Sequence, residues 1–277
     1  MFRVYSHRRV DFDTLFPTRA LLCPNAATLD LIPDTLKTSE WVRKMFDFEP
    51  FPKQIEVLDT TAKYLILCCN RQWGKSTIIA CKALRHAITV PKQSIVVLSR
   101  TKDQAGELIA MVTDRALQLG YPLRRVLGQR YSFKFPNGSK ICAVPHNEDT
   151  SLGRTANILI IDEAARVKDK VYYAVSAFVA HTRGAIWMLS TPKRQTGFFY
   201  NYWHDKKTDW LRIFSNVHDC PNFDQDFLER RKAGDYTTYM QDFECKFVQP
   251  DDSLTTREFV ESMLYTDDEN RNRVPKL

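Results

Sequence analysis

The segment YLILCCNRQWGKST, residues 64–77, constrains the fold of this chain more than any other part of the sequence. It begins as an apolar run typical of a buried strand, passes through a short loop that ends in Gly74-Lys75-Ser76, and continues as a helical pattern over Ser76–Ala87. Loops of this kind wrap nucleotide phosphates with their backbone N–H groups. Cys69 stands where such loops usually begin with glycine, and it is compatible with the turn if its φ stays negative.

The other strand candidates are also short, continuous apolar runs, and helical stretches lie between them. Continuous apolar strands indicate a sheet covered on both faces, which is the mainly parallel, doubly wound α/β arrangement. Asn137-Gly138 predicts a tight turn between antiparallel strands, so we expect a β-hairpin insertion. The strand candidates are Tyr64–Cys68, Ile95–Ser99, Ile158–Ile161, Ile186–Leu189 and the weaker Leu211–Phe214, and the hairpin strands are Tyr131–Phe135 and Ser139–Val144.

Helical signals divide the rest of the chain. The apolar face that follows Thr101 predicts a helix that Thr101 and Gln104 cap as a capping box and that Gly120 ends. A short helix over Ser39–Phe46 stands among scattered prolines. After about residue 216, charged and aromatic helical segments replace the strands, which predicts a small helical lid. We therefore expect an N-terminal arm laid over the core at 1–50, an α/β core at 51–215, a lid at 216–265 and a linker or tail at 266–277.

Composition restricts the class of protein. With 277 residues, of which 44% are hydrophobic and 26% charged, the chain can bury one large core and does not have the composition of a disordered protein. The sequence contains neither an apolar run of the length that a membrane span needs nor the apolar region of a secretory signal. A net charge of +7 favours a polyanionic partner, nucleic acid first. Seven cysteines without a Cys-x-x-Cys pair indicate a reducing compartment and free thiols.

A second motif, NILIIDEAA over 157–165, complements the phosphate loop. It is typical of a strand that ends in a Walker B pair, in which Asp162 holds Mg²⁺ and Glu163 polarises the attacking water. The alternative is an ordinary strand with two acidic residues at its solvent end, which the phosphate loop in the same chain disfavours. Ile95–Ser99 lies between the two motifs, and an extra strand between the Walker strands is typical of ATPases whose catalytic glutamate follows the Walker B aspartate.

Two further segments extend the nucleotide-site hypothesis. LSTP, residues 189–192, follows a strand and offers hydroxyl groups that would sense the γ-phosphate, the alternative being a plain turn before proline. FEPFPKQ, residues 48–54, places Gln54 upstream of the loop, where its amide would hydrogen-bond adenine. We therefore expect ATP and Mg²⁺ as cofactors. The nucleotide-binding candidates are Gln54, Asn70, Arg71, Gln72, Trp73, Gly74, Lys75, Ser76, Thr77, Ser190 and Thr191, and the metal candidates are Ser76 and Asp162.

These motifs, in this order, resemble those of terminase large subunits, the DNA-packaging motors of tailed bacteriophages. NRQWGKST is similar to their phosphate loop, which tolerates replacement of the first glycine, and IIDEAA is similar to their Walker B motif. STP followed by GFFYNYW resembles their coupling motif, LSRTKDQAGEL the segment after their second strand, and YMQDFECKFV the end of their ATPase domain. The resemblance covers roughly residues 45–260 and implies a RecA-like ATPase of the class with an additional strand and a catalytic glutamate (ASCE).

The resemblance also implies a function and partners. It implies a homo-oligomeric ring that drives double-stranded viral DNA into a procapsid. The isolated domain can still be monomeric. The implied partners are the portal protein and the small terminase subunit, in the host cytoplasm and transiently at the procapsid portal. Lys75 would bind phosphate and Glu163 would be the catalytic base. Arg71 would stabilise developing charge, with a salt bridge within the loop as its alternative, and Arg154 would act on a neighbour's nucleotide, with Arg124, Arg125 and Arg183 as less favoured substitutes.

One departure from the family is expected, and two other functions compete. Terminase large subunits usually continue into a metal-dependent nuclease domain, and we expect ATPase without nuclease activity in this chain. The alternatives are a helicase-like translocase, which would need a second RecA-like domain, and a nucleotide-dependent binding protein without productive turnover, which the presence of Lys75 and Glu163 disfavours. Packaging of any sequence requires contacts to the DNA backbone. The candidates for these contacts are Arg124, Arg125, Arg130, Lys134, Lys140, Lys193, Arg194, Lys206 and Lys207.

Overall fold

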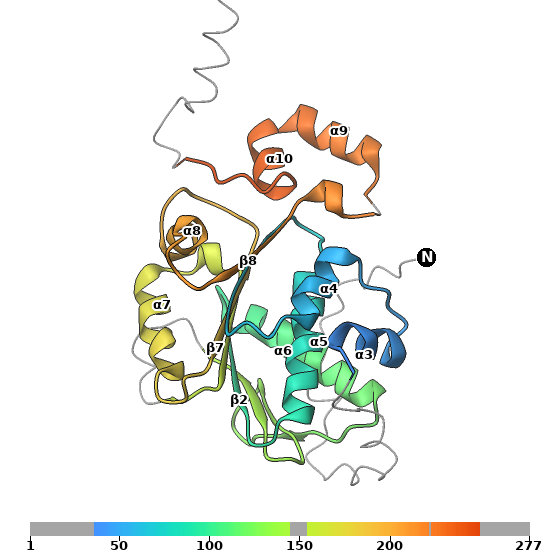
Figure 1. The fold of residues 1–277 in the computed structure, drawn as a ribbon, viewed down its shortest axis with the longest axis vertical. Coiled ribbons are helices and arrows are strands. Elements are labelled where there is room, and N and C mark those ends of the chain that lie inside the picture. Colours follow the sequence, from blue (N-terminus) through green and yellow to red (C-terminus); the bar gives the residue numbers. More distant parts are fainter. Residues whose placement is uncertain (1–35, 145–153, 222, 250–277) are drawn as a thin grey trace, which may run out of the picture.

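An eight-stranded sheet forms the centre of the computed structural model, which describes residues 36–144, 154–221 and 223–249 (Figure 1). The strand order is β3-β4-β5-β2-β6-β7-β1-β8, and every neighbouring pair from β5 to β8 is parallel. The expected α/β fold with a mainly parallel sheet is confirmed. The strands are β1 (Tyr64–Cys69), β2 (Ser94–Leu98), β3 (Arg124–Arg125), β4 (Ser132–Lys134), β5 (Lys140–Ala143), β6 (Ile158–Asp162), β7 (Ala185–Ser190) and β8 (Leu211–Ser215).

Alternate residues of the parallel strands enter two different cores, because both faces of the sheet are covered. In β1, Leu65 and Leu67 pack with the helices on one face, whereas Ile66 and Cys68 pack with those on the other. This is why the strand reads as a continuous apolar run. One face carries α3 (Thr38–Met45), α4 (Pro52–Asp59), α5 (Lys75–Thr89) and α6 (Lys102–Gln118), and the other carries α7 (Asp169–Ser176) and α8 (Phe198–His204) (Figure 1).

The strand that separates the two Walker strands in the sheet is β7, which corrects the expectation drawn from sequence order. Ile95–Ser99 lies between the motifs along the chain, but its strand, β2, lies on the far side of β6. β7 pairs with β1 on one side and with β6 on the other, so its last residue, Ser190, lies between the two motifs. Parallel strands are joined by crossovers, which can skip a position in the sheet, and chain order therefore differs from sheet order.

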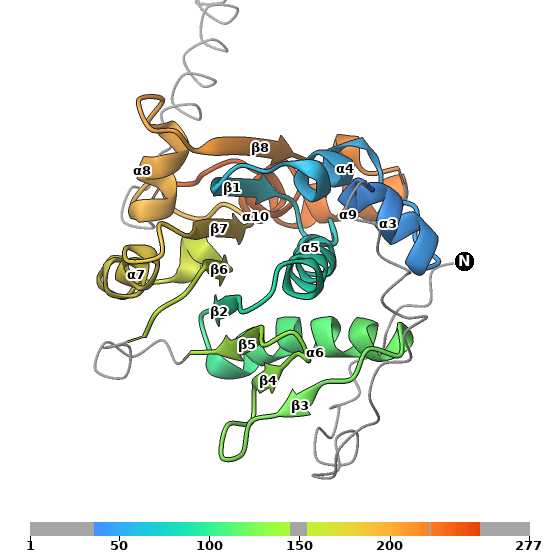
Figure 2. The same ribbon diagram turned by 60° about the horizontal axis from the view of Figure 1, so that its bottom comes forward.

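The predicted hairpin forms the antiparallel edge of the sheet, where β4 and β5 pair and β3 adds an outermost strand (Figure 2). The Phe135 N–H donates to the Ser139 carbonyl at 2.8 Å across the turn, in which Gly138 has φ +84°. That φ is left-handed, and it is the reason the turn needs glycine. β5 also pairs in parallel with β2, so the insertion continues the main sheet.

Helix α6 begins and ends where the sequence predicts. The Thr101 hydroxyl accepts from the Gln104 N–H at 3.2 Å, and Gly120 follows the helix with φ +65°. The capping box is incomplete, however, because the Gln104 side chain does not return to Thr101. Its Oε1 is buried without a hydrogen-bond partner among the described residues. This leaves one acceptor of Gln104 available near the carboxyl end of the sheet.

The described part of the N-terminal region is a helix built into the core. Trp41 and Val42 of α3 are fully buried against the cluster that α4 and α5 share. The Ser39 hydroxyl donates to the Asp59 carboxylate at 2.7 Å and so ties α3 to the end of α4. The predicted helix near residue 39 is confirmed. The rest of the predicted arm, the end of the predicted lid and the predicted tail lie outside the described residues.

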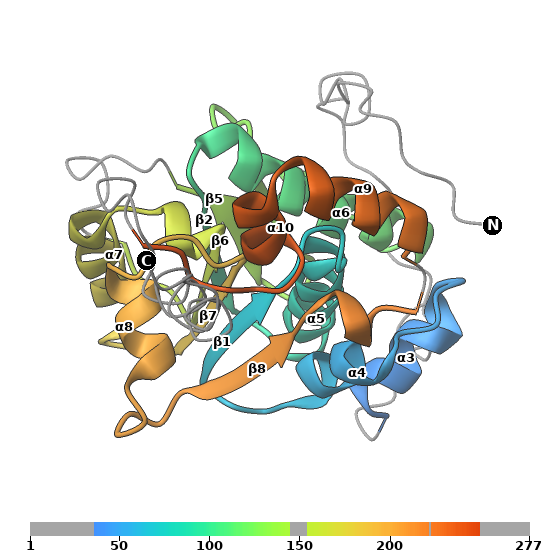
Figure 3. The same ribbon diagram turned by 90° about the horizontal axis from the view of Figure 1, so that it is seen from above.

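The segment after β8 is helical, as predicted, and lies over the carboxyl ends of the central strands (Figure 3). Helices α9 (Gln225–Gly234) and α10 (Tyr236–Asp242) enclose a small core of their own. We refer to residues 216–249 as the lid. Among the described helices, none has the length and apolar character to cross a membrane. The lid core comprises Val217, Leu228, Tyr239 and Phe243.

Candidate nucleotide-binding site

The phosphate loop connects β1 to α5 at the carboxyl edge of the sheet, where ligands of open α/β sheets bind. Cys69 is the last residue of β1, fully buried and paired with Ser215 of β8. In the loop after it, Gln72 (φ 61°) and Gly74 (φ 87°) are left-handed, whereas Cys69 is not. The first glycine of the usual motif is therefore dispensable here, because this chain places its left-handed turns later in the loop.

The loop is held from outside by α4. Gln54 is 4% exposed, and its Nε2 donates to the Trp73 carbonyl at 2.8 Å. Its Oε1 accepts from the Phe51 N–H, and the Phe51 ring packs edge-on against Trp73 with 5.4 Å between centroids. A Cβ on Gly74 would lie 3.2 Å from Gln54 Nε2. Gln54 thus supports the loop in this structure, and its contact with adenine stays a prediction.

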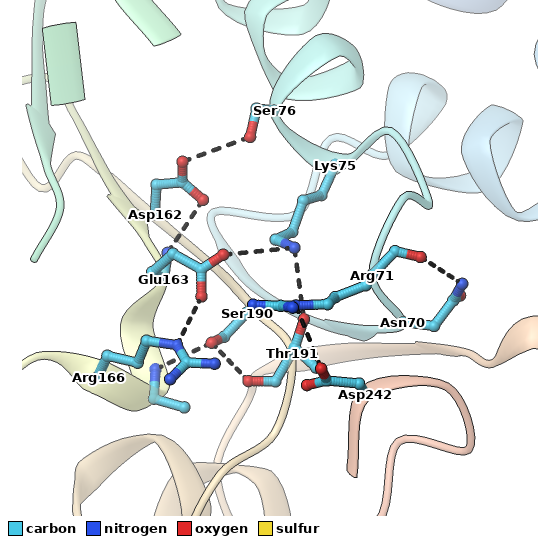
Figure 4. A network of polar contacts seen from close by, with 11 residues as sticks. Asn70, Arg71, Lys75, Ser76, Asp162, Glu163, Arg166, Ser190, Thr191 and Asp242 are labelled. Atoms are coloured by element: carbon cyan, nitrogen blue, oxygen red, sulfur yellow. Dashed lines mark hydrogen bonds and ion pairs between the residues drawn. The ribbon is translucent and has the colours of Figure 1, made fainter. Parts of the chain in front are cut away.

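Lys75 points from the start of α5 toward the Walker B strand (Figure 4). Its Nζ lies 3.4 Å from Glu163 Oε1 and 3.4 Å from the Thr191 hydroxyl. Burial alone would lower the pKa of Lys75, but its neighbours Cys69, Glu163 and Asp162 raise that pKa above its ordinary value. The side chain is therefore an ammonium that a phosphate can recruit.

Ser76 and Asp162 form an oxygen-rich pair beside Lys75. The Ser76 hydroxyl lies 3.4 Å from Asp162 Oδ2, and Asp162 Oδ1 accepts from the Glu163 N–H at 2.9 Å. Burial and the adjacent Glu163 raise the pKa of Asp162 to about 6. A cation beside Asp162 would stabilise its ionised carboxylate and so offset both burial and the repulsion from Glu163.

These residues fit a magnesium ion. Ser76, Asp162 and Glu163 line a pocket together with Ser99 and Gln104. The Ser99 hydroxyl and the Gln104 Oε1 are buried without a hydrogen-bond partner among the described residues. Hard divalent cations prefer carboxylate and hydroxyl oxygens, and Mg²⁺ keeps several of its waters, which need acceptors such as these. Sequence reasoning missed Ser99 and Gln104, because only the fold brings the end of β2 to the Walker B pair.

The serine that ends β7 and the threonine that follows it face different ways. The Thr191 hydroxyl faces Lys75, as a phosphate-sensing group should. The Ser190 hydroxyl accepts from the Ala165 N–H at 3.2 Å and donates to the Thr191 carbonyl at 2.7 Å. Ser190 therefore ties β7 to the turn that follows the Walker B strand, and Thr191 is the member of the pair that lies at the nucleotide site.

Arg71 joins the phosphate loop to the lid (Figure 4). Its N–H donates to the Asp242 carbonyl at 2.8 Å, and its Nε lies 3.3 Å from Asp242 Oδ2. The Asn70 amide donates to the Arg71 carbonyl at 2.8 Å, which further fixes the loop. The alternative role that the sequence predicts for Arg71 is a salt bridge within the loop. The structure shows a salt bridge, but its partner lies at the end of α10.

Comparison with known proteins identifies the family. The model for the N-terminal part of terminase large subunits of the T4likevirus type matches residues 67–262, which is most of the chain. The chain belongs to this terminase family. Tripartite terminase subunit 3 of equine herpesvirus 1 (strain Ab4p) is 34% identical to it over 118 residues, which are 40% of this chain and 15% of that protein. The large terminase subunit of Thermus phage G20c is 23% identical over 184 residues, 59% of this chain and 38% of that protein.

Solved structures confirm the terminase fold. The large terminase ATPase domain of Thermus phage P74-26 superposes with a TM-score of 0.67 at 18% identity, over 77% of this chain and all of that domain. A large terminase from a thermophilic bacteriophage in complex with ADP superposes with a TM-score of 0.63 at 16% identity, over 72% of this chain and 54% of that one. The terminase chain described here thus spans well under half the length of the curated relatives it matches.

The arginine predicted to act on a neighbouring subunit lies away from the chain's own phosphate loop. Arg154 is exposed, and its guanidinium lies 4.0 Å from the Cys142 sulfur of β5. The next residue, Thr155, accepts from the Ser94 hydroxyl at the amino end of β2, whereas the phosphate loop lies at the carboxyl ends. Arg183 likewise precedes β7, at the amino edge of the sheet. In this structure of the terminase chain, both arginines thus lie at the edge of the sheet opposite to the phosphate loop.

Several predicted DNA-contacting residues of the terminase chain gather at the antiparallel edge of the sheet. Arg124 pairs with Lys134, and Lys134 pairs with Lys140, so three cations stand in one row across β3, β4 and β5. All three are exposed. Directly opposed like charges destabilise a sheet. Arg125 lies half-buried beside the row, while Lys193 and Arg194 lie separately, where the lid chain returns past β7 at Val248.

Proposed function

We propose that this chain is a Mg²⁺-dependent, ATP-hydrolysing motor domain that translocates double-stranded viral DNA into a procapsid. The observation that carries the proposal is the contact of Lys75 with Glu163 beside that of Ser76 with Asp162, across β1, β7 and β6. A phosphate-binding ammonium, a metal-binding pair and a general base thereby meet at one edge of the sheet. Family membership supports the same activity, since the residues that the family model matches, 67–262, include both Walker motifs of this chain.

Each residue has a distinct part in the proposed hydrolysis. The loop N–H groups and Lys75 bind the β- and γ-phosphates, and Ser76 and Asp162 would hold Mg²⁺. When bound, Mg²⁺ neutralises charge on the phosphate oxygens. Glu163 accepts the hydrogen bond of the attacking water and orients that water toward the γ-phosphate. Thr191, which faces Lys75, reports the loss of the γ-phosphate to β7 and the segment that follows it.

Hydrolysis develops negative charge on the transferred phosphate group, which a further cation would stabilise. The chain offers two candidate arginines for this role. Arg71 lies in the loop itself, where release from Asp242 would bring it to the nucleotide. Arg154 is exposed at the opposite edge of the sheet and would serve a neighbour in a ring. An arginine supplied by another subunit raises the rate of such enzymes by orders of magnitude. We infer a homo-oligomeric ring at the procapsid portal in the host cytoplasm, with the portal protein and the small terminase subunit as partners.

The cation row on β3, β4 and β5 supports the proposed DNA contact. Arg124, Lys134 and Lys140 repel one another in the free protein, and a polyanion across the row would relieve that repulsion. Contacts to phosphates carry no sequence preference, as packaging of a whole genome requires. Their affinity for DNA falls steeply with salt, because each neutralised phosphate releases counterions.

Magnesium-dependent ATP hydrolysis, measured across protein concentrations, tests the proposed function. We expect slow turnover per chain that rises with concentration and with DNA, and that disappears in Glu163→Ala. Turnover that stays constant with concentration would contradict the ring with a donated arginine. Absence of hydrolysis with intact ATP binding would favour the nucleotide-dependent binding protein, and duplex unwinding would favour the helicase-like translocase. Incubation of plasmid DNA with Mg²⁺ or Mn²⁺ tests the separate prediction that this chain has no nuclease activity.

A further inference from the structure

The Glu163 carboxylate has two cationic partners, and the second was not assigned from the sequence. Its Oε1 lies 3.4 Å from Lys75 Nζ, while its Oε2 lies 3.2 Å from the Nε of Arg166 (Figure 4). The Arg166 and Glu163 side chains are 21% and 25% exposed, so the pair is partly withdrawn from water. Each oxygen of the predicted general base is thus held by a different cation.

The local backbone determines the Arg166 contact. Residues Ala164–Arg166 form a 3-10 turn in which the Arg166 N–H donates to the Glu163 carbonyl at 2.8 Å. A 3-10 helix has three residues per turn, so side chains at i and i+3 lie in line. Glu163 itself has φ 52°, a left-handed conformation that non-glycine residues seldom adopt. Such strain is retained where the surroundings enforce it, often at functional sites.

The turn is also fixed to the rest of the sheet. The Ala165 N–H donates to the Ser190 hydroxyl of β7, and the Val167 N–H donates to the Ala164 carbonyl at 3.1 Å. Ala164 is fully buried in the core between the sheet and α7. Arg166 therefore approaches Glu163 from a rigid base, whereas Lys75 approaches it from the phosphate loop.

We propose that Arg166 is a positioning residue that keeps the Glu163 carboxylate oriented for catalysis once ATP has drawn Lys75 away; this inference rests on the proposed ATPase function. The phosphates of ATP carry more negative charge than one carboxylate and recruit the Lys75 ammonium. Oε1 of Glu163 is then free to accept a hydrogen bond from the attacking water. Oε2 stays on Arg166, so the carboxylate does not rotate away. Before ATP binds, cations thus engage both oxygens of the Glu163 carboxylate, and ATP binding frees one of them.

A purely structural i,i+3 ion pair would have a different outcome. Partly exposed pairs of that kind contribute little to stability and nothing to catalysis. If Arg166 positions Glu163, its removal lowers the rate of hydrolysis without changing nucleotide affinity, because Arg166 contacts Glu163 and not the phosphates. A direct contact with phosphate would instead weaken nucleotide binding.

The test is steady-state hydrolysis, together with ATP affinity from a fluorescent analogue, for Arg166→Ala, Arg166→Lys and the matched control Lys168→Ala. Lys168 is exposed two residues away, so its removal changes the charge of the turn equally without touching Glu163. For Arg166→Ala we expect kcat to fall about 10- to 100-fold, with KM and ATP affinity within about 2-fold of the wild type. Arg166→Lys should recover part of the rate, and Lys168→Ala should retain the wild-type rate.

Combination with Glu163→Gln separates positioning from all other effects. If Arg166 acts through Glu163, the double variant hydrolyses ATP no more slowly than Glu163→Gln alone. A further loss in the double variant, an unchanged kcat in Arg166→Ala, or a KM that rises in proportion would overturn the positioning role. A wild-type chain that hydrolyses no ATP at any concentration, with or without DNA, would overturn the proposed function and this inference together. Thermal unfolding of every variant verifies that each one folds.

Discussion

Replacement of Gln54 by alanine decides whether this residue supports the phosphate loop or reads adenine. The substitution removes two hydrogen bonds, a buried one to the Trp73 carbonyl and a partly buried one from the Phe51 N–H. Gln54 and Trp73 are 4% and 1% exposed, so water does not readily replace the lost partner. A buried polar group without its partner costs about 1–3 kcal/mol, and the second bond adds about 0.5–1.5 kcal/mol. We therefore expect Gln54→Ala to lower the free energy of unfolding by about 2–4 kcal/mol.

Two assays read out this change. Thermal unfolding should shift down by about 2–4 °C per kcal/mol for a domain of this size, while the adjacent Lys53→Ala, which loses only an exposed ion pair with Glu56, should shift little. The affinities for ATP and GTP should fall together, because a loosened loop binds the shared phosphates less well. If Gln54→Ala unfolds like the wild type yet loses its preference for ATP over GTP, the residue reads adenine and the support argument is wrong.

Four further predictions concern the loop, the lid, a buried lysine and the cation row. Cys69→Gly should lower stability by about 1 kcal/mol and leave ATP hydrolysis intact, because this position does not use a left-handed φ; a higher rate than the wild type would contradict this. Asp242→Asn should speed proteolysis of the lid but cost less than about 1 kcal/mol in unfolding, because Arg71 is 57% exposed; an unchanged cleavage rate would count against the contact. Burial lowers the pKa of Lys82 to about 8, so between pH 8 and its higher unfolded-state pKa the unfolded chain binds the extra proton and the contribution of this group to stability rises with pH; urea unfolding at pH 8 and pH 10 should show that the wild type gains stability relative to Lys82→Met as the pH rises. Lys134→Ala should reduce the salt dependence of DNA binding by about one phosphate contact while slightly raising the unfolding temperature, and a loss of stability instead would show that the cation row is not repulsive.

The parallel strands and the two Walker motifs were predictable from the sequence because each is a local pattern. Continuous apolar runs mark strands buried on both faces, and Gly74-Lys75-Ser76 and Asp162-Glu163 each follow such a run. The hairpin at Gly138 was equally local, since its turn requires a positive φ.

Features that depend on crossovers were not predictable. Nothing local in the sequence indicates that β7 rather than β2 lies between the Walker strands, because that choice belongs to the sheet as a whole. For the same reason Ser99 and Gln104 were missed at the metal site, and the Asp242 partner of Arg71, 171 positions further along the chain, was missed too. Arg166 is the exception, since its spacing of three from Glu163 was visible in DEAAR and became informative only through the 3-10 turn.

The most direct test of the proposed nucleotide site separates ATP binding from ATP hydrolysis. Single-turnover hydrolysis and nucleotide binding should be measured on the wild type, Lys75→Ala and Glu163→Gln in the presence of Mg²⁺. We expect Lys75→Ala to lose ATP binding, because the phosphates lose their ammonium, and Glu163→Gln to bind ATP but to hydrolyse it far more slowly than the wild type. Hydrolysis by Glu163→Gln at the wild-type rate would show that this carboxylate is not the base and that the site assembled around it is misassigned.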